Sequence, residues 1–200
     1  QVSVNKKAGL DFATLLRSLV RQDPDVLLVG EIRDTETAEI ATHASLTGHL
    51  VLSTLHTTDA VSALHRLVDI GVPDYIAVHT LEAAIAQRLV RRVCDHCAEE
   101  RPVDPVEARS LGLNGELTHV KVGDGCDRCR GTGYRGRIGI FELLRVGEDL
   151  REAFLSRAPR GELVSLARAS GMLTLREDGL EKVGRGITTP EEVLRVTTAG

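Results

Sequence analysis

Four cysteines form two Cys-x-x-Cys pairs in the middle of the chain. Cys94 and Cys97 make the first pair and Cys126 and Cys129 the second, with 28 residues between the pairs. Two such pairs can supply four thiolates to a tetrahedral Zn2+ ion, and a site with four cysteine ligands has no open position for a substrate. We therefore expect these four residues to bind zinc in a structural role.

Disulfides or a redox-active pair are the alternative for the same cysteines, and unligated thiols are a third. The N-terminal residues do not form a secretory signal, and in a reducing compartment paired Cys-x-x-Cys motifs more often bind metal. Gly131 and Gly133 follow the second pair and permit tight turns in which backbone N–H groups face the sulfurs. His96 could replace a cysteine as ligand, but its place between two ligands favours a solvated position.

A carboxylate and an imidazole each follow a short apolar run. Residues 26–29 read VLLV and are followed by Gly30 and Glu31, and residues 50–53 read LVLS and precede His56. Neighbouring parallel strands would place Glu31 and His56 at one edge of a sheet, where α/β proteins bind ligands. Glu31 could orient a water for attack on a γ-phosphate or help hold the Mg2+ shell, and His56 could stabilise phosphate charge. The alternatives are a solvated loop glutamate and a histidine that lines a loop.

Helices and strands alternate around these two residues. Aspartates suited to cap helices precede the apolar periodic runs, and glycines follow several of them. The short apolar runs are typical of strands buried on both faces of a parallel sheet. We expect helices over residues 12–20, from Asp34 to Gly48, from Asp59 to Gly71 and from Pro73 to about Val90, strands over 26–29 and 50–53, and an edge strand at Val2 and Val4. This alternation predicts an α/β fold with a mainly parallel sheet and flanking helices.

The composition changes after residue 90, so we expect three segments. Residues 1–90 form the α/β core. Residues 91–136 contain the four cysteines and seven glycines without apolar periodicity, which indicates a small module that folds around its metal. Residues 137–200 begin with a strand at 138–144 and continue as a region of short helices.

Composition also argues against two classes of partner. The net charge of −4 and the five aromatic residues do not fit a basic nucleic-acid surface with stacking platforms. No apolar stretch approaches the roughly 18 residues of a membrane span, so we expect no direct membrane insertion. The four cysteines without a secretory signal fit a reducing compartment, and we take the cytosol as the default. The chain begins at Gln1 rather than Met, and we expect it to be part of a longer polypeptide.

Two stretches together resemble the type II secretion and type IV pilus assembly ATPase superfamily. They are residues 21–34, with the sequence RQDPDVLLVGEIRD, and residues 44–57, with the sequence ASLTGHLVLSTLHT. Within this superfamily, the tetracysteine region and the stretches LREDGL at 175–180 and EEVLRVT at 191–197 are similar to general secretory pathway protein E. The resemblance covers nearly the whole chain.

The resemblance implies a RecA-like P-loop ATPase core that uses ATP and Mg2+, beside the Zn2+ of the cysteine module. It implies that Glu31 is the catalytic carboxylate at the end of the Walker B motif, assisted by His56. It also implies that the second stretch is the His box near the γ-phosphate. The nucleotide-binding residues expected on this basis are Gly30, Glu31, His49, His56 and Thr57.

The resemblance further implies a cytoplasmic homo-hexamer that couples ATP hydrolysis to pseudopilus assembly and protein export. Its partners would be an inner-membrane platform protein and a cytoplasmic recruiting protein, through which it associates peripherally with the inner membrane. Type IV pilus assembly is the alternative, and a nonenzymatic zinc-stabilised docking module is another. The 200 residues contain no G-x-x-x-x-G-K-[ST] motif, so we expect the phosphate-binding loop upstream and expect these residues alone to be inactive.

Overall fold

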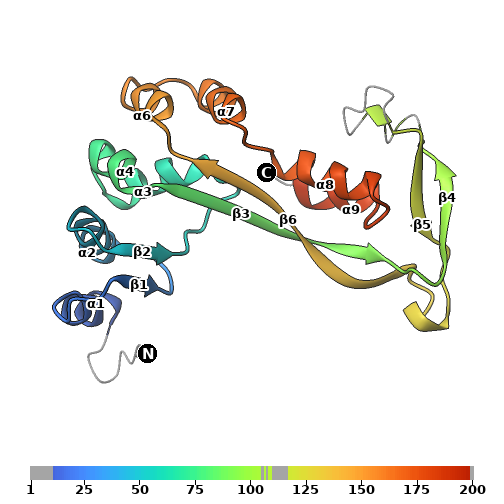
Figure 1. Cartoon of the computed structure of the whole chain (residues 1–200), viewed down its shortest axis with the longest axis horizontal. Coiled ribbons are helices and arrows are strands. Elements are labelled where there is room, and N and C mark those ends of the chain that lie inside the picture. Colours follow the sequence, from blue (N-terminus) through green and yellow to red (C-terminus); the bar gives the residue numbers. More distant parts are fainter. Residues whose placement is uncertain (1–10, 105, 107, 110–116, 199–200) are drawn as a thin grey trace. The chain divides into compact units, whose positions relative to one another are not determined.

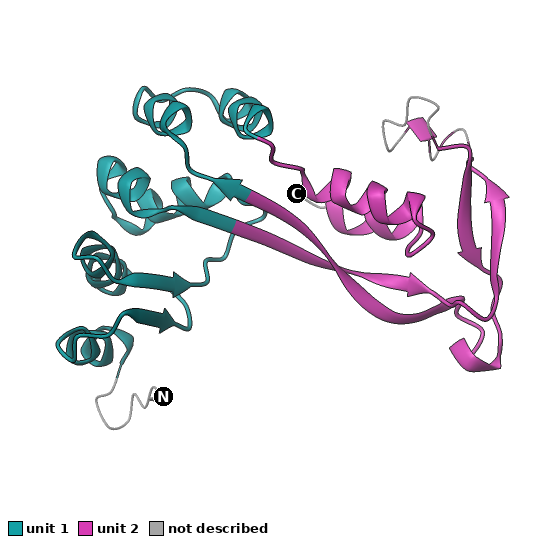
Figure 2. Ribbon diagram, viewed as in Figure 1, with its two compact units in different colours: residues 1–84, 144–170 teal, residues 85–143, 171–200 magenta. Residues whose placement is uncertain are grey.

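The computed structural model describes residues 11–104, 106, 108–109 and 117–198. The expected edge strand at Val2 and Val4 lies outside the described residues. The chain divides into two compact units (Figure 2). Unit 1 comprises residues 1–84 and 144–170, and unit 2 comprises residues 85–143 and 171–200. This division cuts across the three segments expected from the sequence, because each unit combines stretches that lie far apart along the chain.

Unit 1 is built on a parallel pair of strands (Figure 1). Strand β1 (Val26–Val29) pairs with β2 (Leu50–Ser53) in a register that places Val26 opposite Leu50 and Val29 opposite Ser53. Helices α1 (Phe12–Val20) and α2 (Thr35–Leu46) pack against one face of this pair, where Leu27 and Val29 join the hydrophobic core. The predicted strands and the two helices that flank them are confirmed.

The first three helices of unit 1 lie within their predicted ranges. Asp11 and Asp34 accept hydrogen bonds of 2.8 Å from the third residues of α1 and α2, as N-caps do. Asp59 accepts a hydrogen bond of 2.9 Å from Ser62 N–H at the start of α3 (Ser62–Ile70). Gly71 ends α3 with a φ of 114°, a backbone conformation that other residues rarely adopt.

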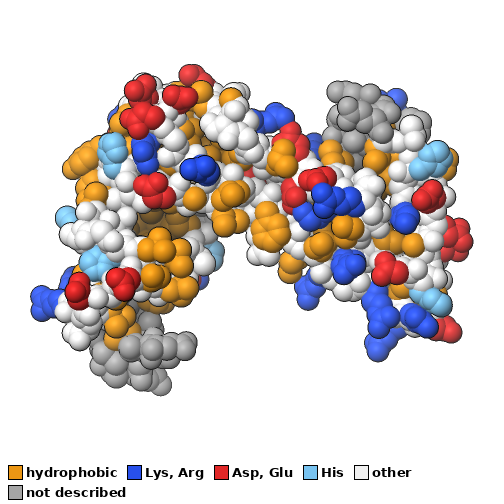
Figure 3. All heavy atoms as spheres, viewed as in Figure 1, with side chains coloured by type: hydrophobic (Ala, Val, Ile, Leu, Met, Phe, Trp, Pro, Cys, Tyr) orange, Lys and Arg blue, Asp and Glu red, His pale blue; other side chains and the backbone are white. Residues whose placement is uncertain are grey.

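The other face of β1 and β2 is exposed to solvent. Figure 3 shows hydrophobic side chains gathered over these two strands. The face is formed by four aliphatic side chains, each about half exposed or more, namely Val26, Leu28, Leu50 and Leu52. Parallel sheets of α/β proteins are covered on both faces, whereas here α1 and α2 cover one face.

The prediction of a fourth helix from Pro73 to about Val90 is wrong in its second half. Helix α4 (Asp74–Thr80) ends ten residues earlier, and strand β3 (Ala83–Val93) follows. The residues of β3 include good helix formers such as alanine, glutamine and arginine, so propensity alone favours a helix. Pairing with β6 (Tyr134–Arg145) overrides this preference and buries alternate residues of β3, including Ala86 and Val90.

Helices α6 (Glu148–Leu155) and α7 (Arg160–Ala169) come from the C-terminal third of the chain but belong to unit 1. The ring of Phe154 on α6 meets the ring of His65 on α3 edge to face, with 5.0 Å between ring centroids. Arg151 Nε on the same helix donates a hydrogen bond of 2.9 Å to the carbonyl of Val78 on α4. These contacts dock α6 on α3 and α4.

Unit 2 holds the cysteine region and the last two helices. Strands β3 and β6 run in opposite directions (Figure 1), so the prediction of a mainly parallel sheet holds only for β1 and β2 among the described strands. Strands β4 (Ala98–Pro102) and β5 (His119–Gly123) form an antiparallel hairpin, and η2 (Asp127–Cys129) is a short 3-10 helix. Helices α8 (Leu175–Gly184) and α9 (Pro190–Thr197) bury Val183 and Val193 against Val120 of β5.

Candidate active site and metal centre

Glu31 and His56 lie together at the carboxyl ends of β1 and β2. Their closest atoms, Glu31 Oε2 and His56 Nε2, are 3.6 Å apart. Thr54 joins the two strand ends, because its hydroxyl donates to the Gly30 carbonyl at 2.8 Å and its carbonyl accepts from the Ile32 N–H at 3.1 Å. The parallel register therefore places these two side chains at one edge, as the sequence indicated.

Arg33, which is not among the site residues predicted from the sequence, completes this cluster. Its Nη2 atom lies 2.7 Å from Glu31 Oε2 and 3.2 Å from His56 Nε2. The one signal in the sequence was its position two residues after Glu31. The side chains of Arg33 and His56 are 60% and 66% exposed, and that of Glu31 is 29% exposed, so an incoming ligand can reach all three.

This arrangement suits chemistry on a phosphate. Guanidinium and imidazole groups donate hydrogen bonds to phosphate oxygens, and Arg33 and His56 present both from neighbouring loops. The carboxylate of Glu31 accepts hydrogen bonds and can orient a water molecule beside them. The cluster thus combines donors for an anion with one acceptor for a nucleophile.

His49 is placed apart from this cluster. It precedes Leu50, the first residue of β2, and so lies at the opposite end of the strand from His56. Its Nδ1 atom is 3.0 Å from the Ala44 carbonyl and 3.2 Å from the Thr47 hydroxyl, at the end of α2. Thr57, by contrast, directly follows His56, and its N–H donates to the Leu55 carbonyl at 3.2 Å.

Asp59 anchors the loop that carries His56. Its carboxylate accepts hydrogen bonds from the Thr58 hydroxyl at 3.0 Å, from the N–H and hydroxyl of Ser62, and from Arg160 Nη2 at 2.8 Å. Burial alone would raise the pKa of Asp59, but the hydrogen bonds from Ser62, Arg160 and Thr58 outweigh it and lower the pKa. The loop is therefore held at its end by an ionised carboxylate.

The four cysteines converge in unit 2. Their sulfur atoms all lie within 4.8 Å of one another, and the nearest pairs are 3.7 to 3.9 Å apart. These separations are far longer than a disulfide bond, and all four cysteines are free. Cys94 and Cys129 are buried, while Cys97 and Cys126 are partly exposed. Four thiolates at this spacing fit the tetrahedral geometry that Zn2+ prefers.

Backbone N–H groups point at one of the sulfurs. Cys129 Sγ accepts hydrogen bonds from the N–H of Cys126 at 3.1 Å and of Gly133 at 3.3 Å. Burial alone would raise the pKa of Cys129, but these two N–H groups, together with hydrogen bonds from the Cys126 and Cys97 thiols, outweigh it and lower the pKa to about 6. Burial raises the pKa of Cys97 to about 12. Metal binding requires the thiolate form, so a metal bound at these four sulfurs would take the place of the thiol protons.

Close backbone packing requires glycine beside the cluster. Gly133 has a φ of 74°, and a Cβ on it would lie 2.3 Å from the carbonyl oxygen of Gly123. Gly131 shares the same φ of 74°. The glycines noted in the sequence thus form the tight turn that brings the N–H of Gly133 onto Cys129. His96, in contrast, is exposed and is absent from the group of potential ligands found among the described residues.

The fold is that of secretion ATPases. The chain superposes on the pilus retraction motor PilT, in a structure with bound ADP, with a TM-score of 0.63 and 27% identity over 93% of this chain and 43% of that one. It superposes on the ATPase DotB of Legionella pneumophila with a TM-score of 0.62 and 23% identity over 95% of this chain and 43% of that one.

The family model described as "Type II/IV secretion system protein" matches residues 1–195, and the chain belongs to this family. It is 52% identical to the type IV pilus assembly ATPase PilB of Thermus thermophilus, over 98% of this chain and 22% of that protein. It is also 52% identical to type II secretion system protein E of Pectobacterium carotovorum, over 98% of this chain and 39% of that protein. The chain therefore spans less than half the length of these relatives, and the resemblance seen in its sequence is confirmed.

Proposed function

We propose that these residues are the part of a secretion or pilus assembly ATPase that activates water for attack on the γ-phosphate of ATP. The observation that carries this proposal is the cluster of Glu31, Arg33 and His56 at the carboxyl ends of two parallel strands. Relatives described as ATPases match almost the whole chain and support the same assignment.

Each side chain of the cluster has a distinct role in the proposed reaction. Arg33 holds Glu31 Oε2 at 2.7 Å, and we assign the other oxygen, Oε1, to the attacking water. Arg33 and His56 donate hydrogen bonds toward the phosphate oxygens, where negative charge accumulates during phosphoryl transfer. Gly30 and Thr57 belong to the same two loops, and His49 supports the end of α2 at the far end of β2.

This proposal includes two kinds of metal ion, Mg2+ with the nucleotide and Zn2+ at the cysteines. Mg2+ neutralises charge on the phosphates when nucleotide is bound, and Glu31 is the carboxylate of the cluster that would face its water shell. Zn2+ would be held by Cys94, Cys97, Cys126 and Cys129, whose soft thiolates and spacing fit this ion. Its role is to stabilise the fold of unit 2, because four cysteines leave no position for a reactant.

The full protein, in this proposal, is a cytoplasmic homo-hexamer that drives the assembly of pseudopilin or pilin filaments. It works with an inner-membrane platform protein and a cytoplasmic recruiting protein. Relatives of both kinds match equally, at 52% identity, so secretion and pilus assembly are both supported. Among the described residues, no helix has the length and apolar character needed to cross a membrane.

The test is a Glu31→Gln substitution in the full-length protein, with ATP hydrolysis and equilibrium nucleotide binding measured on one preparation. We expect turnover to fall about 10²- to 10⁴-fold, the range for loss of a positioned acid–base group, with nucleotide affinity unchanged. Glu39→Gln is the matched control, because Glu39 is exposed on α2 away from the cluster. Hydrolysis at the unmodified rate by Glu31→Gln would falsify the assignment, and a full-length protein that hydrolyses no ATP at all would favour the docking module.

A further inference from the structure

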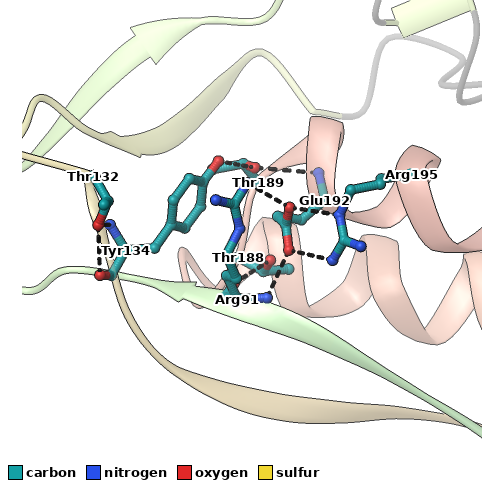
Figure 4. Close-up of polar contacts among 7 residues, drawn as sticks. All are labelled: Arg91, Thr132, Tyr134, Thr188, Thr189, Glu192 and Arg195. Carbon is teal, nitrogen blue, oxygen red and sulfur yellow. Dashed lines mark hydrogen bonds and ion pairs between the residues drawn. The ribbon is translucent and has the colours of Figure 1, made fainter.

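A fully buried carboxylate lies in unit 2, far in sequence from the cysteines. Glu192, at 0% exposure, is the third residue of α9. It accepts hydrogen bonds of 2.8 Å from the N–H and the Nη2 of Arg91, and of 2.9 Å from Nε and Nη2 of Arg195 (Figure 4). All its oxygens are thus engaged with charged or backbone donors, and loss of such a buried group leaves two guanidinium groups without their partner.

These contacts fix the strand that leads into the first cysteine pair. Arg91 lies on β3, three residues before Cys94. The Thr188 hydroxyl donates to the Arg91 carbonyl at 2.8 Å, and the N–H of Val93 donates to the Ile187 carbonyl at 2.9 Å. Residues 187–192 therefore hold the end of β3 through its backbone as well as through the Arg91 side chain.

The strand that leaves the second cysteine pair is held by the same segment. Tyr134 is the first residue of β6, and its hydroxyl lies 2.9 Å from the Thr189 hydroxyl. The Arg91 guanidinium stacks over the Tyr134 ring at 4.1 Å, which ties the two strands to each other (Figure 4). The hydroxyl of Thr132 then links Tyr134 to the cysteines. It donates a hydrogen bond of 2.7 Å to the Cys129 carbonyl and accepts one of 3.3 Å from the Tyr134 N–H.

We propose that Thr188, Thr189 and Glu192, together the C-terminal clamp, act as positioning residues for the metal site formed by the four cysteines. The clamp holds the ends of β3 and β6 at the separation at which the N–H of Cys94 reaches the Gly133 carbonyl at 2.9 Å and the four sulfurs lie within 4.8 Å. This proposal rests on the proposed zinc site and deepens it.

The physical reason is the cost of ordering the ligands. A site whose ligands are already in place spends less of its binding free energy on ordering the chain, so it binds metal more tightly. Without the clamp, fewer contacts hold the ends of β3 and β6 together in the metal-free protein, chiefly the hydrogen bond from the Cys94 N–H to the Gly133 carbonyl. Residues that hold metal ligands in place typically contribute about 10- to 100-fold to affinity, and we expect about tenfold here because Glu192 acts through Arg91.

The test measures zinc affinity of the reduced protein by competition with a chelator, and uses Co2+ absorption bands to report tetrahedral thiolate coordination. Glu192→Gln removes the charge and retains the shape. Tyr134→Phe removes only the hydroxyl that contacts Thr189. This second variant tests the same proposal if Glu192→Gln does not fold. Glu191→Gln is the matched control, because Glu191 is the adjacent residue on α9 and is exposed.

We expect about tenfold weaker zinc binding for Glu192→Gln, about threefold weaker binding for Tyr134→Phe and no change for Glu191→Gln. The cobalt spectrum of each saturated variant should retain its tetrahedral thiolate bands, since the ligands are unchanged. Wild-type affinity in Tyr134→Phe and in a folded Glu192→Gln variant overturns the clamp. If the unmodified protein binds neither Zn2+ nor Co2+, the zinc site itself is wrong, and that outcome is distinct from failure of the clamp alone.

Discussion

The carboxylate of Asp59, three residues after His56, accepts a hydrogen bond of 2.8 Å from Arg160, which is 101 residues away in the sequence. Asp59 also accepts from Thr58 and Ser62, so the loop that carries His56 is joined both to α3 and to α7. The Asp59 side chain is only 16% exposed, so water and salt screen this ion pair less than they screen a fully exposed one. Helix α7 is therefore tied to a loop of the candidate active site.

Replacement of Arg160 by Ala should lower the turnover of ATP by the full-length protein. We expect a loss of about three- to tenfold in kcat, smaller than the ~10²-fold that a 1 Å misplacement of a catalytic group can cause, because Ser62 still holds Asp59. KM for ATP should change little. Arg160→Lys should restore most of the rate, since an ammonium group can also bond the carboxylate.

The control for this prediction is Arg145→Ala, which removes an exposed arginine from the same unit. Steady-state kinetics of Arg160→Ala in a His56→Ala background provide the sharper comparison. If Arg160 acts through the His56 loop, its removal has little further effect there. An equal loss in both backgrounds would show that Arg160 affects hydrolysis by another route.

His56→Ala should reduce ATP turnover less than Glu31→Gln. The imidazole is 3.6 Å from Glu31, and Arg33 remains 2.7 Å from the same carboxylate oxygen when the ring is removed. We expect a loss of about 10²-fold, at the lower end of the range for removing one hydrogen-bond donor that stabilises charge in the transition state. His43→Ala is the control, because His43 is exposed on α2. A His56 variant as inactive as the Glu31 variant contradicts this ranking of the two residues.

The sequence was sufficient to predict the parts of the fold whose signals are local. Continuous apolar runs predicted β1 and β2, and capping aspartates with terminal glycines predicted the helices between them. Because parallel strands end at one edge, the meeting of Glu31 and His56 followed from these elements. The approach of the four cysteines followed in the same way from their paired spacing.

Contacts between distant segments left no such signal. The residues of β3 favour a helix by propensity, and only their pairing with β6, about 50 residues later, selects the strand. Arg160 meets Asp59, and Glu192 meets Arg91, each across 101 residues. Periodicity and spacing report what lies within a few residues, so neither ion pair could be predicted from the chain alone.

Cys97→Ser should abolish zinc binding and loosen unit 2 while β1 and β2 stay folded. A serine hydroxyl is a much weaker zinc ligand than a thiolate, and the core around β1 and β2 contains no cysteine. Metal analysis should find about one zinc per unmodified chain and none in the variant. Hydrogen exchange should increase for residues 94–97 and 126–133 and stay unchanged for Val26–Val29.

Two comparisons make this prediction specific. His96→Ala should keep its zinc, because His96 is exposed beside the site. Removal of metal from the unmodified protein by a chelator should reproduce the exchange pattern of Cys97→Ser. A metal-free preparation with reduced cysteines and fully protected amides in residues 94–97 would contradict a structural role for zinc.

The stability that Glu192 gives to unit 2 should disappear in acid. Burial alone would raise the pKa of this carboxyl, but hydrogen bonds from Arg195 and Arg91 outweigh it and lower the pKa to about 2, from an ordinary value of 4.5. A carboxylate with a lowered pKa stabilises the folded state above the ordinary value, and this contribution is lost as the pH falls from about 4.5 toward about 2. The lowered pKa corresponds to a contribution from this carboxylate on the order of 3 kcal/mol to the free energy of unfolding at neutral pH.

The measurement is urea unfolding of the wild type and of Glu192→Gln between pH 3 and pH 7, with metal removed from both so that zinc release does not contribute. The chain has two tyrosines and no tryptophan, so a Tyr75→Phe background leaves Tyr134 as the fluorescent reporter of unit 2. The charged groups bonded to Glu192 are Arg91 and Arg195, and their guanidinium groups stay protonated throughout this range. The difference in unfolding free energy between the two proteins should therefore be largest near pH 7 and shrink steadily below pH 4.5. A difference that does not depend on pH would show that the carboxylate of Glu192 is not held in its charged form by the two arginines.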